Sequence, residues 1–282
     1  MSTPLPALFA GLVDDAAVFP PGSTPLPEAV REHGRHRSAW YAPLVGPLLV
    51  PASELGALAE LVGPDATLAV GIVADTGIAG LRAVPPPARV EIRQVEAAVA
   101  KRGEDPQPGL AALLAVLREW PESTGYAEIP LTFGLLAALD TLADARAGGL
   151  DVAAKFRTGG LAAELFPTPI ELAAVICACR DRLLPFKLTA GLHHAIRHID
   201  PETGFAHHGF LNILVATVAA VGGAEVADVG ASLAGTDPLP LIEVARRYLD
   251  HDRPLWIGFG SCSVDEPVAD LTQLGLLAQV PS

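Results

Sequence analysis

Continuous apolar runs alternate with longer segments of helical periodicity along this chain. Such runs, which lack the polar alternation of a half-buried sheet, are typical of strands in a parallel sheet covered on both faces. The expected strands are Leu8–Val13, Pro47–Val50, Thr67–Val73, Arg89–Ile92, Tyr126–Ile129, Val152–Phe156, Pro185–Thr189 and Leu255–Phe259. The expected helices are Pro27–Ala39, Ser53–Leu61, Gly109–Glu119, Phe133–Ala147, Thr168–Arg182, Phe210–Val221, Pro238–Leu249 and Val264–Leu277, with a short one at Thr76–Ala83.

Eight strands that alternate with helices predict an α/β fold, a single (β/α)8 TIM barrel over residues 1–282. An open, doubly wound sheet is the competing arrangement. No G-x-G-x-x-G motif follows the first strand, so a dinucleotide cofactor is not supported. About 65 residues separate the seventh and eighth strands, which predicts a long insertion because one crossover needs far fewer.

Function in such a barrel belongs to the carboxyl ends of the strands and to the loops that follow them. The polar residues and glycines expected there include Asp14, Asp15, Asp75, Glu91, Arg93, Glu128, Lys155, Arg157, Thr158, Lys187, Thr189, His193, His194, Gly260, Ser261 and Cys262. Lysine is the most informative type, because only three of the 19 Lys and Arg residues are lysines. Lys155 and Lys187 lie inside apolar segments, where an unneeded charge is costly.

Lys155 and Lys187 fall near the ends of the sixth and seventh expected strands. Side chains alternate along a strand, so Lys155 shares a face with Arg157, and Lys187 with Thr189. If both lysines face the barrel interior, each disfavours the charge of the other, and one is expected to lose its proton near neutral pH. A neutral amine is the nucleophile that forms a Schiff base with a carbonyl compound.

Two other arrangements of these lysines are open. Each lysine could pair with a carboxylate in a buried ion pair, for instance Lys155 with Glu128. Alternatively, the strand alternation runs the other way, and both side chains extend outward among the helices.

The two lysine segments resemble those of deoxyribose-phosphate aldolase, a class I (Schiff-base) aldolase. The matching runs are Lys155-Phe-Arg-Thr-Gly159 and Phe186-Lys-Leu-Thr-Ala-Gly191. The segment from Val13 to Pro20 is similar to the start of that family, and the run Ile257-Gly-Phe-Gly-Ser261 is similar to its phosphate-binding glycine-serine loop. The turn Gly191-Leu-His-His departs from the family's Gly-Gly turn and following arginine, so the resemblance leaves open whether the substrate carries a phosphate.

The resemblance implies a TIM barrel in which Lys155 forms the Schiff base and Lys187 lowers the pKa of Lys155. It also implies a fourth-strand acid, for which Glu91 is the match. The first hypothesis is therefore a cofactor-free lyase that acts on a small carbonyl compound, with room for the substrate beside Gly159 and Gly160. Proton transfer is assigned to Asp15, His193 and His194, and substrate binding to Asp14, Arg157, Thr158, Thr189, Gly260 and Ser261.

Five of the eight histidines fall within residues 193–208. Imidazoles suit zinc, iron or nickel, and Asp14, Asp15, Asp200, Glu202 or Cys262 could complete a metal site. No H-E-x-x-H motif is present, so metal binding, metal-free acid-base chemistry and a solvated lid are all open for this loop. The second hypothesis is a metal-dependent hydrolase or lyase that uses this loop, and the third is a non-catalytic barrel that binds a small molecule.

The composition of the chain limits the classes of partner that it is expected to bind. The net charge of −13 argues against nucleic acid or an anionic membrane as the main partner, because both require clustered Lys and Arg. Residues Met1–Pro6 lack the features of a signal peptide, and no apolar run is long enough to span a membrane, so a cytoplasmic enzyme is expected, with homo-oligomerisation possible.

Smaller signals concern the cysteines and two N-terminal histidines. The sparse cysteines indicate reduced thiols. Cys177 and Cys179 are expected to pack in a helix, whereas Cys262 is a candidate nucleophile to which the sequence assigns no base. His33 and His36 lie in a charged helical segment and are expected at the surface.

Overall fold

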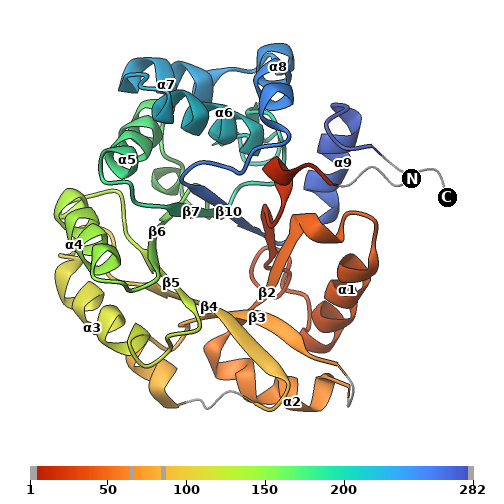
Figure 1. Cartoon of the computed structure of the whole chain (residues 1–282), viewed down its shortest axis with the longest axis vertical. Helices are drawn as coiled ribbons and strands as arrows, with labels where there is room; N and C mark the ends of the chain where they lie inside the picture. The colour runs from red at the N-terminus through yellow and green to blue at the C-terminus, as the bar shows by residue number, and fades with distance from the viewer. Residues whose placement is uncertain (1–4, 64–65, 84–86, 279–282) are drawn as a thin grey trace.

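The computed structural model describes residues 5–63, 66–83 and 87–278. Its main sheet is a closed barrel of parallel strands in the order β1-β10-β7-β6-β5-β4-β3-β2. Figure 1 looks along the barrel, with the strands in a central ring and the helices outside it. The expected (β/α)8 fold is therefore confirmed and the open sheet is excluded. Residues 1–4, part of the segment in which no signal peptide is expected, lie outside the described residues.

The barrel strands follow the expected order along the chain. They are β1 (Val13–Asp15), β2 (Val45–Pro51), β3 (Leu68–Val73), β4 (Val90–Ala98), β5 (Thr124–Glu128), β6 (Val152–Arg157), β7 (Phe186–Thr189) and β10 (Trp256–Ser261). The first strand begins later than expected, because Leu8 and Phe9 belong to a 3-10 helix, Ala7–Phe9, in which both side chains are fully buried. Their apolar character thus reflects burial of a turn rather than a strand.

Strand β4 differs most from expectation, because it continues past Ile92 to Ala98. Its pairing with β3 is irregular: Ile92 lies opposite Val70, whereas Gln94 lies opposite the next residue, Gly71. An extra residue in one strand reverses the inward and outward alternation that follows it. The apolar pattern that marked the strand therefore changes phase in its middle.

The outer helices pack against the barrel largely where the sequence predicts them. They are α1 (Leu26–Ser38), α2 (Leu58–Leu61), α3 (Gln107–Leu117), α4 (Leu135–Ala147), α5 (Pro169–Asp181) and α9 (Asp265–Gln273). Helix α5 begins with a capping box, in which Thr168 and Glu171 satisfy each other's backbone N–H groups. Part of the expected helix Ser53–Leu61 is instead a 3-10 helix, Ala52–Ala57, and the short segment after β3 is a 3-10 helix, Ile78–Ala83.

The long insertion between β7 and β10 has a structure of its own. It contains a small antiparallel pair, β8 (His198–Ile199) and β9 (Ala206–His207), and then α6 (Phe210–Val221), α7 (Val226–Ala234) and α8 (Pro238–Tyr248). Helix α7 was not expected from the sequence. Figure 1 shows these three helices together outside β7 and β10, where they thicken one side of the barrel. No helix among the described residues has the length and apolar character needed to cross a membrane.

The aromatic side chains of β6, β7 and β10 face outward, toward the helices. Phe156 and Phe186 pack with ring centroids 6.4 Å apart, and Phe259 stacks between Phe210 and Trp256. All of these side chains are buried. Because side chains alternate along a strand, the residues next to these aromatic residues on β6 and β7 must face the barrel interior.

Candidate functional site

Both lysines project into the barrel from adjacent strands. Lys155 lies directly opposite Lys187 in the register of β6 and β7. Their exposed fractions are 4% and 1%. The expectation that both ammonium groups face the interior is met, and the alternative in which they extend among the helices is excluded.

Each lysine is held by carboxylates. Lys155 Nζ lies 2.7 Å from Glu96 Oε2 and 2.9 Å from Glu128 Oε2. Lys187 Nζ pairs with Asp14 and with the other oxygen of Glu96. We call these five residues the lysine network. Its centre is Glu96, which bridges the two ammonium groups and is fully buried.

Two further side chains complete the surroundings of Lys187. Its ammonium group donates a hydrogen bond to Gln94 Oε1 at 2.8 Å and lies 4.8 Å from the centre of the Tyr126 ring. The position of Asp14 also depends on Gly46, because a Cβ there would lie 1.8 Å from Asp14 Oδ1. A glycine on β2 therefore leaves the space that the Asp14 carboxylate occupies.

The charge state of the lysines differs from the expectation. Burial alone would lower the pKa of Lys155, but Glu128 and Glu96 outweigh it and raise that pKa above its usual value. Asp14 and Glu96 do the same for Lys187, whose pKa is also raised. The prediction that mutual repulsion leaves one lysine neutral near pH 7 is therefore wrong for the resting site. The repulsion is present, but the nearer carboxylates are stronger.

The carboxylates of the network shift in different directions. Burial would raise the pKa of Glu96, but the two lysines lower it to about 2. Burial also acts on Glu128, yet Lys155 and Arg157 bring its pKa below the usual range. For Asp14, burial outweighs the attraction of Lys187, so its pKa is raised. Asp14 is thus the network carboxylate closest to accepting a proton.

Glu96 is a site residue that the sequence pattern did not indicate. The fourth-strand acid was expected at Glu91, but Glu91 is exposed and pairs with Arg93 before the irregularity in β4. The acid that meets both lysines comes five residues later, beyond the strand end expected at Ile92. The apolar residues Val95 and Ala97 flank Glu96 in the sequence, and this alternation is the signal that could have indicated a strand there. All three residues are buried in the structure.

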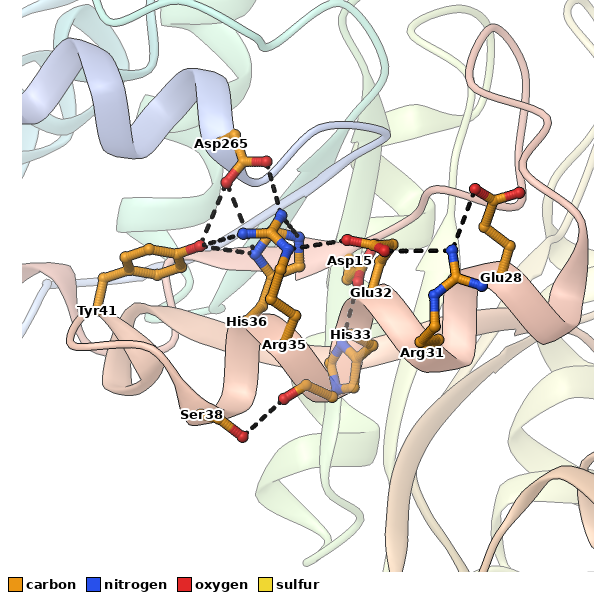
Figure 2. A network of polar contacts seen from close by, with 11 residues as sticks. Asp15, Glu28, Arg31, Glu32, His33, Arg35, His36, Ser38, Tyr41 and Asp265 are labelled. Carbon is orange, nitrogen blue, oxygen red and sulfur yellow. Dashed lines mark hydrogen bonds and ion pairs between the residues drawn. The ribbon is translucent and has the colours of Figure 1, made fainter.

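Asp15 does not join the lysine network. It follows Asp14 on β1 and faces the opposite side, where its carboxylate lies 3.0 Å from His33 Nδ1 on α1 (Figure 2). Its expected role in proton transfer is therefore replaced by a structural contact between strand and helix. The expectation that His33 and His36 lie at the surface is also wrong, since their exposed fractions are 3% and 5%.

Thr158 and the two glycines after it have structural roles instead of the predicted roles at the substrate. Thr158 is fully buried, and its hydroxyl donates to the backbone oxygen of Ala190 at 2.7 Å. The expected space beside Gly159 is filled, because a Cβ there would lie 2.8 Å from Gly191 Cα. Likewise, a Cβ on Gly160 would lie 2.4 Å from Leu165.

An open cavity of about 250 Å³ lies instead at the carboxyl ends of β4, β5 and β6. Its polar wall includes Glu128 and Arg157, which are joined by an ion pair of 3.2 Å. Its apolar wall includes Ile129, Leu131 and Phe166. Glu128 therefore touches both the cavity and Lys155, which lies just behind it.

Thr189, Gly260 and Ser261 occupy the adjacent rim on β7 and β10. Gly260 faces inward, because a Cβ there would lie 3.7 Å from Thr189 Oγ1. Ser261 is buried, and its hydroxyl accepts a hydrogen bond from the Ser263 N–H at 3.3 Å. Thr189 and Gly260 thus face the barrel interior, whereas the Ser261 hydroxyl is engaged in its own turn.

The histidines of residues 193–208 have different partners, although the rings of His194, His198 and His207 pack in a row with centroids 4.9 and 5.3 Å apart. His193 and His194 contact Glu266 and Asp270 on α9, at 2.7 and 3.3 Å. His208 is buried against the backbone oxygen of Pro167, and burial lowers its pKa to about 4. Within the described residues, no three His, Cys, Asp or Glu side chains are grouped in a way that could hold a metal ion.

Comparisons with known proteins identify no relative. A scan against protein-family models and searches of curated proteins and of solved structures gave no significant match. The barrel implied by the resemblance to deoxyribose-phosphate aldolase is thus supported by the structure, whereas membership of that family is not supported by any match.

Proposed function

We propose that this barrel is a lyase of the class I aldolase type, in which Lys155 forms a Schiff base with a small carbonyl substrate. The observation that carries the proposal is the position of Glu96, whose two oxygens contact two buried lysines in register on adjacent strands. A carboxylate between two amines gives the site a nucleophile, a proton acceptor and a second cation within contact distance.

The raised pKa of Lys155 defines the first step. The resting ammonium group must lose a proton before its nitrogen can attack, and Glu96 and Glu128 are the acceptors in contact with it. The amine then adds to the carbonyl carbon, and the carbonyl oxygen leaves as water after accepting two protons. Lys187 keeps a positive charge beside Glu96 and stabilises the anionic form of that side chain when the proton moves on.

The cavity next to Glu128 fits the proposed substrate class. Its volume of about 250 Å³ suits a compound of few heavy atoms. Arg157 and Glu128 offer a hydrogen-bond donor and an acceptor for hydroxyl or carboxylate groups, while Ile129, Leu131 and Phe166 cover an apolar part. Entry of a carbonyl group near Glu128 would separate Glu128 from Lys155, which favours release of the lysine proton.

Borohydride trapping with a panel of small aldehydes and ketones tests this function. We expect a reduced adduct on Lys155, located by peptide mass spectrometry, with a yield that rises toward alkaline pH because the resting ammonium group must deprotonate. Lys155→Arg should abolish trapping, since guanidinium stays protonated. Lys101→Arg is the matched control, because Lys101 is the exposed third lysine, and it should trap like the original protein.

The outcomes separate the remaining hypotheses. An adduct on Lys187 alone would exchange the roles of the two lysines. Ligand binding in the cavity without any adduct would favour a non-catalytic barrel, and activity that chelators remove would favour metal-dependent chemistry.

A further inference from the structure

Cys262 lies in a second cluster of reactive side chains, away from the residues of the lysine network. It directly follows β10, and its sulfur lies 3.8 Å from His193 Nε2 in the loop after β7. The other ring nitrogen of His193, Nδ1, lies 2.7 Å from Glu266 Oε2 in the first turn of α9. Because β7 and β10 are neighbours in the barrel, the fold brings these three residues together at its carboxyl-terminal rim.

The order of contacts in this cluster is that of an activated nucleophile. A thiol is in reach of one imidazole nitrogen, and a carboxylate holds the other, which fixes the orientation of the ring and stabilises its charged form. The contact with Cys262, together with Glu266, raises the pKa of His193 to about 9 despite partial burial. The contacts therefore favour the charged form of the His193 ring, which lies beside the Cys262 sulfur.

The other cysteines provide a contrast within the same chain. Cys177 and Cys179 are buried in α5, and burial raises the pKa of both thiols, that of Cys179 to about 12. Cys262 is partly exposed. Only Cys262 among the three combines access to solvent with a histidine at its sulfur.

The loop between β1 and α1 covers one side of Cys262 closely. A Cβ on Gly22 would lie 3.0 Å from the Cys262 Cβ and 2.9 Å from the backbone oxygen of Ala17. The glycine thus lets the loop pack closely against the Cys262 side chain.

We propose that Cys262, His193 and Glu266 form a second nucleophilic site, in which the thiol accepts the acyl group of a small ester or thioester and passes it to water. The proposal is independent of the Schiff-base function, because none of its residues belongs to the lysine network.

Each step conserves atoms and charge. His193 takes the proton of the Cys262 thiol as the sulfur attacks the carbonyl carbon, a carbon–sulfur bond forms, and the bond to the leaving oxygen or sulfur breaks. The leaving group takes the proton of the His193 imidazolium. Water then attacks the enzyme thioester while neutral His193 accepts its proton, so that the carboxylic acid is released and the thiol is restored.

Hydrolysis of p-nitrophenyl acetate by the full chain tests the proposal. We expect a burst of p-nitrophenolate and an acetyl group on Cys262 in acid-quenched protein, located by peptide mass spectrometry. Cys262→Ala should remove both. His193→Gln should slow acylation by about 10²-fold or more, as expected for loss of a general base. Glu266→Gln should slow it less and shift its pH profile, because Glu266 acts through the ring of His193.

Two measurements keep the result decisive. Cys177→Ala is the matched control and should retain the burst, and circular dichroism should confirm that every variant is folded. The rate of iodoacetamide labelling at Cys262 should fall in His193→Gln without a change in fold. Acetylation that spares Cys262, or labelling and acylation rates unaffected by His193→Gln, would overturn the proposal.

Discussion

The barrel interior and the outer face of α1 each carry a chain of alternating charges, but the two chains differ in burial. In the lysine network, the side chains of Glu96 and Lys155 are 0% and 5% exposed. Along α1, Arg31 pairs with Glu28 and Glu32, and the Arg31 side chain is 67% exposed (Figure 2). In the interior chain every charge contacts an opposite charge within the protein, whereas the side chains of the outer chain remain largely in contact with water.

The difference shows what an ion pair requires at each place. A buried charge loses its hydration, so every member of the interior network depends on its partners. Exposed charges keep their water, and their mutual attraction contributes little to folding. Replacing one member of the interior network is therefore expected to destabilise the protein, because it leaves another buried charge without a partner. Burying five such groups costs folding free energy, and a functional role for the charges would account for their presence.

Removing the central carboxylate should have the largest effect. Glu96→Gln leaves the two buried ammonium groups with one anion fewer, and breaking a buried pair in this way costs about 3–5 kcal/mol of unfolding free energy. Urea unfolding at neutral pH measures the loss. Glu91→Gln, on the exposed part of the same strand, is the control and should stay within about 0.5 kcal/mol of the original protein. Equal losses in the two variants would contradict the central role of Glu96.

The lysine network should also make the unfolding free energy depend on pH in the acidic range. The pKa of Glu96 falls from 4.5 to about 2 on folding, so its contribution to stability is present above pH 4.5 and is lost as the pH falls toward 2. Asp14 acts in the opposite sense, because its pKa is raised. We expect the unfolding free energy of the original protein to fall more steeply over this range than that of Glu96→Gln. Parallel pH profiles would show that Glu96 is not the group responsible.

The outer chain should give the smallest effect. Arg31→Ala removes two exposed ion pairs and is expected to lower the unfolding free energy by about 0.2–1 kcal/mol, with a still smaller effect at high salt. Thermal unfolding at low and high ionic strength measures it. A loss comparable with that of Glu96→Gln would remove the distinction between the two chains.

The lysines illustrate how far the sequence alone reaches. The alternation of Phe156 and Phe186 with Lys155 and Lys187 could place both ammonium groups inside the barrel, because neighbours on a strand point to opposite faces. The alternative of carboxylate pairing, with Glu128 as the example, was also open to sequence reasoning and is present at 2.9 Å. The charge state of the lysines could not be inferred from the sequence, because it depends on the number of carboxylates that converge from other strands.

Other residues of the site could not be assigned from local pattern. Asp14 and Asp15 are identical in type and adjacent, and only the twist and pairing of β1 decide which one meets Lys187 and which one meets His33. Similarly, the sequence presents Cys262, His193 and Glu266 in segments far apart. Their contact required the neighbouring positions of β7 and β10 in the closed barrel.

The sequence by itself determined the α/β class, the number of barrel strands and the places of the two lysines on adjacent strands, because these follow from periodicity within single segments. The closed barrel decided that both lysines face inward. The tertiary structure alone decided that Glu96 joins the lysines. An extra residue in β4 reverses the alternation between Ile92 and Gln94, and this irregularity arises from pairing with β3 rather than from any pattern within β4 itself. A local period predicts where side chains point only while the register of the neighbouring strand stays regular.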